Sequence, residues 1–219
     1  MSSSGPESRG SKFTADGVKE YERRRYRGID QRIVHAREVR LIGKMLEIIH
    51  EAGGNRPVRN VLDVPCGYGR FTDMLRGCGF EVFNADLSFE MLRRAAEAKG
   101  TPGVVADAKL GLPFRDGTFD AVFSIRFLHH VHDPRERAAV LSEFTRASSR
   151  WMIVSFYRAG GVHEFQRRVR RLFKKSGTRI KMIERGRFEA EAAEAGCQVV
   201  RISPLFPGLH AYHLALLRK

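Results

Sequence analysis

The sequence predicts a doubly wound α/β fold, with a seven-stranded, mostly parallel sheet between two layers of helices and an antiparallel last strand. Short, nearly continuous apolar segments alternate with segments of helical periodicity, which is typical of a parallel sheet buried on both faces. The last two apolar segments are joined by a link too short for a crossover helix, so they should pair antiparallel. With 219 residues, the chain is long enough for one domain with a substantial core.

The first half of the chain contains most of the expected parallel strands. Apolar residues at helical spacing predict a first helix over 33–49, which Gly53 and Gly54 should end. The elements expected next are, in chain order, a strand over 60–64, a helix over 71–75, a strand over 80–86, a helix over 88–98 with Ser88 as N-cap, and strands over 103–107 and 119–125.

The second half predicts the remaining elements. Asp133 is expected to be the N-cap of a helix, with Pro134 as its first residue and Glu136 as the capping-box partner. A fifth strand follows over 151–157, then a later helix, and then the antiparallel pair over 197–203 and 210–217.

Composition and charge suggest the organisation of the chain. Residues 1–18 are expected to be a disordered tail, and 19–219 a single domain with an N-terminal helical cap and a basic helix near 162–175. The net charge of +14 lies on the flanks, because residues 61–160 carry 13 basic and 12 acidic side chains. A neutral core with basic flanks is suited to an anionic partner. The three cysteines have no metal-type spacing, which favours a reduced, cytoplasmic protein without a metal site.

Three acids, Asp63, Asp86 and Asp107, lie at the carboxyl ends of successive predicted strands, where ligands bind in open parallel sheets. Between the first two lies a turn with Gly67 and Gly69, through which the backbone can approach a nucleoside closely. A dinucleotide fingerprint is weakened because its third glycine is replaced by threonine, and a carboxylate beside the turn would repel a pyrophosphate. That carboxylate would instead suit a ligand with an ammonium and a sulfonium, such as S-adenosylmethionine.

Four segments in this order, "VLDVPCGYGRF", "NADLSFEML", "ADAKLGLPFRDGTFDAVFSIRFLHHV" and the antiparallel C-terminal pair, resemble the class I S-adenosylmethionine-dependent methyltransferases of the type 11 branch. The resemblance covers the chain from Tyr21 to its end and implies a Rossmann-like sheet with S-adenosylmethionine as cofactor. It implies that Asp63 and the turn wrap the methionine end, that Asp86 binds the ribose hydroxyls, and that Asp107 binds the adenine amino group. The full set of cofactor residues it implies is Asp63, Pro65, Cys66, Gly67, Tyr68, Gly69, Asp86, Leu87, Met91, Asp107, Ala108, Ser124 and Arg126.

Simpler roles compete with these. The glycines could form a plain tight turn, Asp86 could cap the following helix beside Ser88, and Asp107 could be a solvated loop acid. Cys66 is interpreted as a small filler rather than a nucleophile, because no activating base is placed beside it.

No catalytic residue is assigned, and three weak candidates are Arg126, His129 and His130. Imidazole titrates near neutral pH, but "LHHVHD" could simply pack the start of a helix, and His130 is expected to be the structural member. Arg126, just past a strand end, could bind a carboxylate of the acceptor or lie on the surface.

The basic flanks leave two further questions open. Tyr21, Tyr26 and Arg27 could contact the methionine carboxylate or the acceptor, or belong to a merely solvated helix. Residues 162–175 form an amphipathic basic segment, interpreted either as a surface helix or lid, or as a surface for RNA, a phosphorylated substrate or a peripheral membrane contact.

The sequence therefore predicts methyl transfer from S-adenosylmethionine to an O or N atom of a small-molecule or lipid-linked acceptor, which could be anionic. Two alternatives stay open: an RNA methyltransferase that uses the basic flanks, and a non-catalytic S-adenosylmethionine-binding partner protein. RNA is not favoured, because no aromatic-rich RNA-binding module is present. The sequence gives no oligomeric state.

Overall fold

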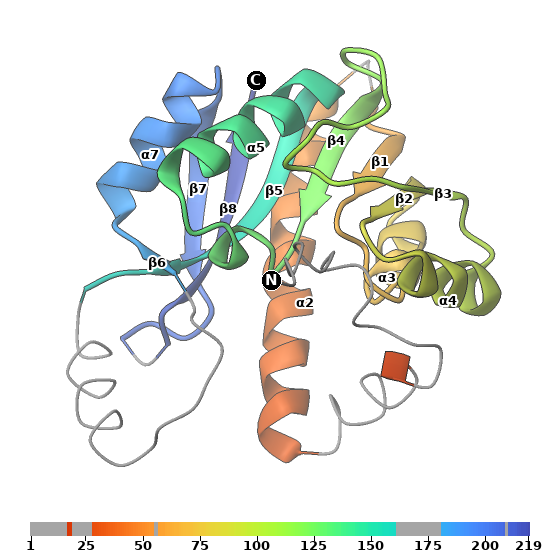
Figure 1. The fold of residues 1–219 in the computed structure, drawn as a ribbon. Coiled ribbons are helices and arrows are strands. Elements are labelled where there is room, and N and C mark those ends of the chain that lie inside the picture. Colours follow the sequence, from red (N-terminus) through yellow and green to blue (C-terminus); the bar gives the residue numbers. More distant parts are fainter. Residues whose placement is uncertain (1–16, 19–27, 55–56, 161–180, 209) are drawn as a thin grey trace, which may run out of the picture.

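The sheet is the centre of the molecule, and the computed structural model describes residues 17–18, 28–54, 57–160, 181–208 and 210–219. Its strands lie in the order β3-β2-β1-β4-β5-β8-β7 (Figure 1). All neighbouring pairs from β3 to β5 are parallel, whereas β8 is antiparallel to both β5 and β7. The predicted mostly parallel sheet with a reversed last strand is therefore confirmed, but the sheet has eight strands rather than the expected seven.

An additional strand, β6, pairs parallel with the end of β5. At two residues it is too short to leave an apolar pattern in the sequence. The strands are β1 (Asn60–Asp63), β2 (Glu81–Asp86), β3 (Gly103–Val105), β4 (Phe119–Ser124), β5 (Ser148–Arg158), β6 (Met182–Ile183), β7 (Gln198–Pro204) and β8 (Tyr212–Arg218). The helices that connect these strands or pack on the sheet are α2 (Ile29–Gly53), α3 (Thr72–Gly77), α4 (Phe89–Lys99), η2 (Leu128–His130), α5 (Pro134–Ala147) and α7 (Arg185–Glu194).

The two faces of the sheet have separate apolar cores, because side chains alternate along each strand. In β1, Leu62 packs in the core shared with α5 and α7, and Val61 packs in the core shared with α2 and α3. Figure 1 shows α5 and α7 in front of the sheet and α2 behind it. This three-layer arrangement buries both faces of the sheet, so a site can form at the ends of the strands.

Two helix starts were predicted from capping residues. The Ser88 hydroxyl accepts a hydrogen bond from the N–H of Met91 (3.3 Å), which confirms the cap of α4. Asp133 caps α5 by accepting from the N–H of Arg135 (2.7 Å). The expected capping box is wrong, because the Glu136 carboxylate bonds the ammonium of Lys109 across the neighbouring loop rather than returning to the cap.

Helix α2 is longer than the 33–49 predicted from its apolar stripe, and its first half extends past the carboxyl ends of the parallel strands (Figure 1). Residues that lie beyond the sheet need no apolar side chain facing it, as Ile33 shows by remaining 55% exposed. The apolar pattern therefore marks the packed part of the helix and not its ends.

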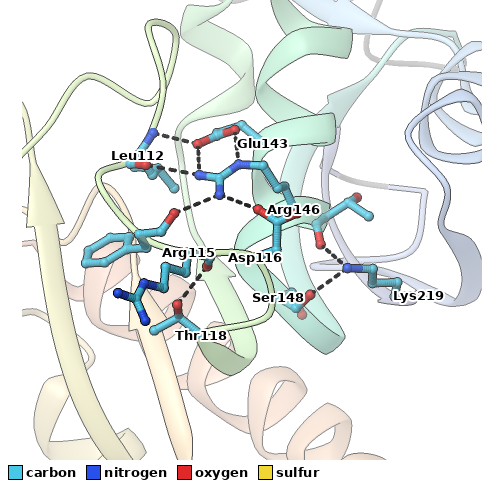
Figure 2. A network of polar contacts seen from close by, with 10 residues as sticks. Leu112, Arg115, Asp116, Thr118, Glu143, Arg146, Ser148 and Lys219 are labelled. Carbon is cyan, nitrogen blue, oxygen red and sulfur yellow. Dashed lines mark hydrogen bonds and ion pairs between the residues drawn. The ribbon is translucent and has the colours of Figure 1, made fainter.

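The amino ends of β4 and β5 are held by the polar network in Figure 2. Arg146, near the end of α5, donates to the carbonyls of Leu112 and Phe114 and to the carboxylates of Asp116 and Glu143. The Lys219 ammonium donates to the carbonyls of Thr145 and Ser148, both at 3.0 Å. These bonds join the β3–β4 loop and the chain end to α5.

Three predictions concern segments outside the described residues: most of the 1–18 tail, the helical cap at 19–27 and the basic helix near 162–175. Within the part of the chain that is described, no helix has both the length and the apolar composition required to cross a membrane.

Candidate functional site

The carboxyl ends of the parallel strands bring the predicted site residues together. Asp63 ends β1, Asp86 ends β2 and Ser124 ends β4, and these three strands are neighbours in the sheet. The strand order reverses at β1, where ligands bind in open parallel sheets. Figure 1 shows these carboxyl ends, which together form the carboxyl edge of the sheet, facing downward beside α3 and α4.

The turn after β1 has the backbone that its glycines predict. Gly67 and Gly69 have φ values of +57° and +77°, in the region that L-residues with side chains avoid. At Gly69 space is also limiting, because a Cβ there would lie 3.1 Å from Thr72 Oγ1 and 3.3 Å from Ala95 Cβ. The turn therefore packs tightly onto the start of α3 and the second half of α4.

Asp86 holds this turn in place. One carboxylate oxygen accepts from the N–H of Gly67 and the other from the N–H of Ser88, both at 2.8 Å. Burial raises the pKa of this carboxyl, although the backbone N–H groups of Ser88 and Gly67 act in the opposite direction. The alternative role beside the helix cap is thus real, and each oxygen still has a lone pair for a further donor.

Asp63 and Ser124 have buried polar atoms without a partner. Asp63 is 2% exposed, and its Oδ2 has no hydrogen-bond partner among the described residues. Burial, and then the charge of Asp86, raise the pKa of Asp63 well above its ordinary value. The Ser124 hydroxyl is also buried and unpaired within the described part of the chain. Such groups are unusual in a folded interior and are suited to a polar ligand.

Cys66 lies inside the turn and is buried. Burial, followed by the charges of Asp63 and Asp86, raises the pKa of its thiol, which donates to the carbonyl of Gly67 (3.2 Å). A thiol of raised pKa is a poor nucleophile, as expected for a filler residue.

A pocket of about 160 Å³ opens between the β1 turn and the loop after β3. It is lined by Val64, Pro65, Leu87, Ala106, Asp107, Ala108, Lys109, Phe127 and His130. Pro65, Leu87, Asp107 and Ala108 were all predicted to bind the cofactor. Met91 is not among these lining residues; it is buried against Tyr68 and Val18. Asp107 accepts a hydrogen bond from the N–H of Lys109 (2.9 Å) at the pocket wall.

The two histidines after β4 have different surroundings. His130 is exposed and lines the pocket, whereas His129 is 7% exposed and lies edge-on to Tyr157, with ring centroids 5.0 Å apart. Burial therefore indicates that His129, and not the expected His130, is the structural member, because His129 is the packed ring. Sequence spacing could not separate them, since the short helix η2 turns neighbouring residues in different directions.

Arg126 is not a free surface side chain, because its backbone and part of its guanidinium are bonded within the protein. Its φ of +63° is left-handed, and its backbone N–H donates to Ser155 Oγ (2.6 Å). Its Nε and Nη2 donate to the Glu38 carboxylate of α2 at 3.1 and 3.3 Å. The guanidinium also lies 5.2 Å from the centre of the Tyr212 ring.

The sequence reasoning missed Glu38, Arg70 and Tyr212. Glu38 is fully buried, and it also accepts from the Arg70 guanidinium and from the Tyr212 hydroxyl (2.7 Å). One available signal was its position four residues after Val34 and four before Ile42, which places a carboxylate within the apolar stripe of α2. Tyr21, Tyr26 and Arg27 lie outside the described residues.

Comparisons with known proteins agree with this arrangement. Residues 62–150 match the family model described as "Methyltransferase domain". A demethylmenaquinone methyltransferase of Thermobifida fusca is 39% identical over 44% of this chain and 43% of its own length. An 18S rRNA (guanine-N(7))-methyltransferase of Schizosaccharomyces pombe is 40% identical over 30% of this chain and 25% of its own. The chain thus spans less than half the length of these relatives.

The fold also matches solved structures. Magnesium protoporphyrin IX methyltransferase of Synechocystis, with bound SAH, aligns at a TM-score of 0.73 and 18% identity. That alignment covers 93% of this chain and 94% of the other. This chain therefore has the fold of the class I methyltransferases, and its match to the methyltransferase family model lies within residues 62–150.

Proposed function

We propose that this chain, which has the class I methyltransferase fold, binds S-adenosylmethionine and transfers its methyl group to an O or N atom of a small-molecule or lipid-linked acceptor. The observation that carries the proposal is the turn at Gly67 and Gly69, held by Asp86 inside the segment that matches the methyltransferase family. The relatives that are named methyltransferases support methyl transfer as the reaction class.

The residues present fit this cofactor. The unpaired, buried oxygen of Asp63 would accept from its ammonium, and the spare lone pairs of Asp86 would accept from its ribose hydroxyls. Leu87, Ala108 and Asp107 would hold the adenine in the pocket. When bound, the cofactor supplies an electrophilic methyl group on a positively charged sulfur.

The contribution of the chain is mainly positioning, because an acceptor atom held in line with the methyl group gains most of the available acceleration. The carboxyl edge beside Ser124 and Arg126 is where we expect the acceptor. An early base is needed only where the acceptor proton must leave before transfer. His129 and His130 remain the candidates for that role, and His130 is the one that lines the pocket.

We propose that the acceptor is anionic. Arg126 uses Nε and Nη2 on Glu38, and its Nη1 has no hydrogen bond to a described residue. Its side chain remains 25% exposed, so Nη1 is available to a carboxylate or phenolate at the edge. The acceptor should therefore contact one guanidinium nitrogen instead of the expected two, because Glu38 already occupies Nε and Nη2.

We propose a cytoplasmic location, supported by free thiols at Cys66, Cys78 and Cys197. The single-domain organisation over 19–219 and a peripheral membrane contact near 162–175 also stay proposals. Tyr21, Tyr26 and Arg27 remain proposed substrate contacts.

The test is turnover. Purified protein is incubated with methyl-labelled S-adenosylmethionine and a fractionated cell extract, and the labelled product is identified. We expect label in a small-molecule or lipid fraction, unaffected by ribonuclease. Label that enters RNA, together with an RNA complex that withstands high salt, would support the RNA alternative. Cofactor binding with no labelled product in any fraction would support the non-catalytic alternative.

A further inference from the structure

The buried carboxylate of Glu38 connects three parts of the chain that meet at the proposed site. It accepts from Arg70 Nη2, from Nε and Nη2 of Arg126, and from the Tyr212 hydroxyl. Arg70 directly follows the glycine turn, Arg126 follows β4, and Tyr212 begins β8. One side chain of α2 therefore joins the cofactor turn, the expected acceptor edge and the reversed strand.

Glu38 remains ionised in this environment. It is fully buried, and burial alone would raise the pKa of its carboxyl. Arg126 and Arg70, together with hydrogen bonds from Arg126 and Tyr212, act in the opposite direction and leave that pKa below its ordinary value. The structure thus keeps a charged carboxylate inside the protein, where a well-packed apolar side chain would often give equal or greater stability.

Arg126 gives an independent indication of function. It is the one non-glycine residue with positive φ among the described residues, and the left-handed conformation costs about 1–2 kcal/mol for a residue with a side chain. Its backbone is held by Ser155, its guanidinium by Glu38, and its flat face by the Tyr212 ring. Strained residues that their surroundings hold so firmly are concentrated at functional sites.

We propose that Glu38 is a positioning residue for methyl transfer: it fixes the Arg126 guanidinium at the acceptor edge and links it to Arg70 behind the glycine turn. This inference rests on the proposed function. Glu38 is fully buried and acts through the arginines, so it need not touch cofactor or acceptor. The cofactor contacts that we assign to Asp63 and Asp86 do not involve Glu38, so its loss should affect turnover rather than cofactor affinity.

The test compares E38Q with the wild type. The amide has nearly the same volume, but it loses the charge and turns a donor toward the arginine donors. We expect the rate of label transfer to the extract acceptor, at saturating cofactor, to fall on the order of 100-fold, as for a displaced substrate-positioning group. Calorimetry with S-adenosylmethionine should show unchanged affinity.

E191Q is the matched control. Glu191 forms a bidentate ion pair with Arg137 at 2.6 and 2.7 Å, both side chains are buried, and the pair joins α5 to α7 on the other face of the sheet. This variant should lose thermal stability while its turnover per folded molecule is unchanged. The comparison separates loss of a buried ion pair from loss of positioning.

Two further variants sharpen the test, and the first of them keeps it decisive if E38Q folds poorly. Y212F removes one hydrogen bond to Glu38 but keeps the ring against Arg126, and it should lower turnover about fivefold. E38Q combined with R126Q should be no slower than the slower single variant, because Glu38 acts through Arg126.

Equal turnover in folded E38Q and wild type would overturn the positioning role alone. So would rate losses that multiply in the double variant, or losses that follow only the fall in thermal stability, as in E191Q. A wild-type protein that binds no S-adenosylmethionine would overturn the proposed function and this inference with it.

Discussion

Polar groups differ between the two ends of the sheet strands. Those at the amino ends (the amino edge) are paired, whereas some at the carboxyl ends (the carboxyl edge) are not. At the amino edge, Arg146 satisfies two carbonyls and two carboxylates, and Lys219 satisfies two more carbonyls (Figure 2). At the carboxyl edge, Asp63 and Ser124 keep buried oxygens without a partner in the described residues, and Arg126 has a strained backbone.

This difference shows which end of the strands stabilises the fold and which end keeps unpaired polar groups that a ligand can use. Buried polar groups are normally paired, because an unpaired one costs about 1–3 kcal/mol. The amino edge follows that rule, so substitutions there should change stability alone. The carboxyl edge departs from that rule, so substitutions there should change ligand binding. Some of them should also increase stability, because they remove the cost of a buried, unpaired polar group.

The largest effect is expected at Gly69. In G69A the new Cβ meets Thr72 Oγ1 and Ala95 Cβ, and the backbone is left-handed. Strain and crowding together should lower the free energy of unfolding by about 3 kcal/mol and abolish cofactor binding. Chemical denaturation and calorimetry measure both. G100A is the control, because Gly100 has a φ of +59° but open space around it; it should lose only about 1 kcal/mol. Equal losses would show that the turn is not tightly packed.

Asp86 should have the next largest effect, on affinity. D86N keeps the side-chain shape, but it loses the charge and one of the two acceptors that the N–H groups of Gly67 and Ser88 use. Affinity for S-adenosylmethionine should fall by about 1–3 kcal/mol, as measured by calorimetry. D116N, which weakens the Arg146 pair at the amino edge, should leave that affinity unchanged. Unchanged affinity in D86N would mean that the ribose lies elsewhere.

The site residues at the carboxyl edge were predictable from the sequence. Strand ends and glycines place Asp63, Gly67, Gly69 and Asp86 together, because nearly continuous apolar runs and a short turn are local features. The reversed strand follows from the short connection before it, which cannot hold a crossover helix.

The parts that could not be predicted depend on long-range contacts. Glu38 and Tyr212 are 174 positions apart in the chain, and no local pattern joins them. The Arg126 guanidinium turns toward α2 because its backbone is left-handed, a conformation expected for glycine or asparagine but not for arginine. Similarly, adjacent histidines separate into one packed ring and one exposed ring only because η2 follows β4.

Arg146 should affect stability without affecting the site. R146A leaves the carbonyls of Leu112 and Phe114 and two carboxylates without their shared donor, in a partly exposed region that water can reach. We expect the free energy of unfolding to fall by about 1–2 kcal/mol, with cofactor affinity unchanged. R93A, at an exposed helical ion pair, is the control and should change stability little. A loss of affinity in R146A would mean that the two edges are coupled.

Asp63 should show the smallest effect on stability and the reverse sign. Burial and the charge of Asp86 raise its pKa in the folded protein, so the folded state binds its proton more tightly than the unfolded state. Stability must then fall as pH rises above the unfolded pKa of this group. D63N removes that loss and should be more stable than the wild type at pH 7.5, by about 1 kcal/mol, while binding S-adenosylmethionine more weakly. At pH 4, where the wild-type carboxyl is largely protonated, the two should have similar midpoints in thermal unfolding. If D63N were instead less stable than the wild type at pH 7.5, Asp63 would have a partner in the ligand-free protein, and the contrast between the two edges would fail at its central residue.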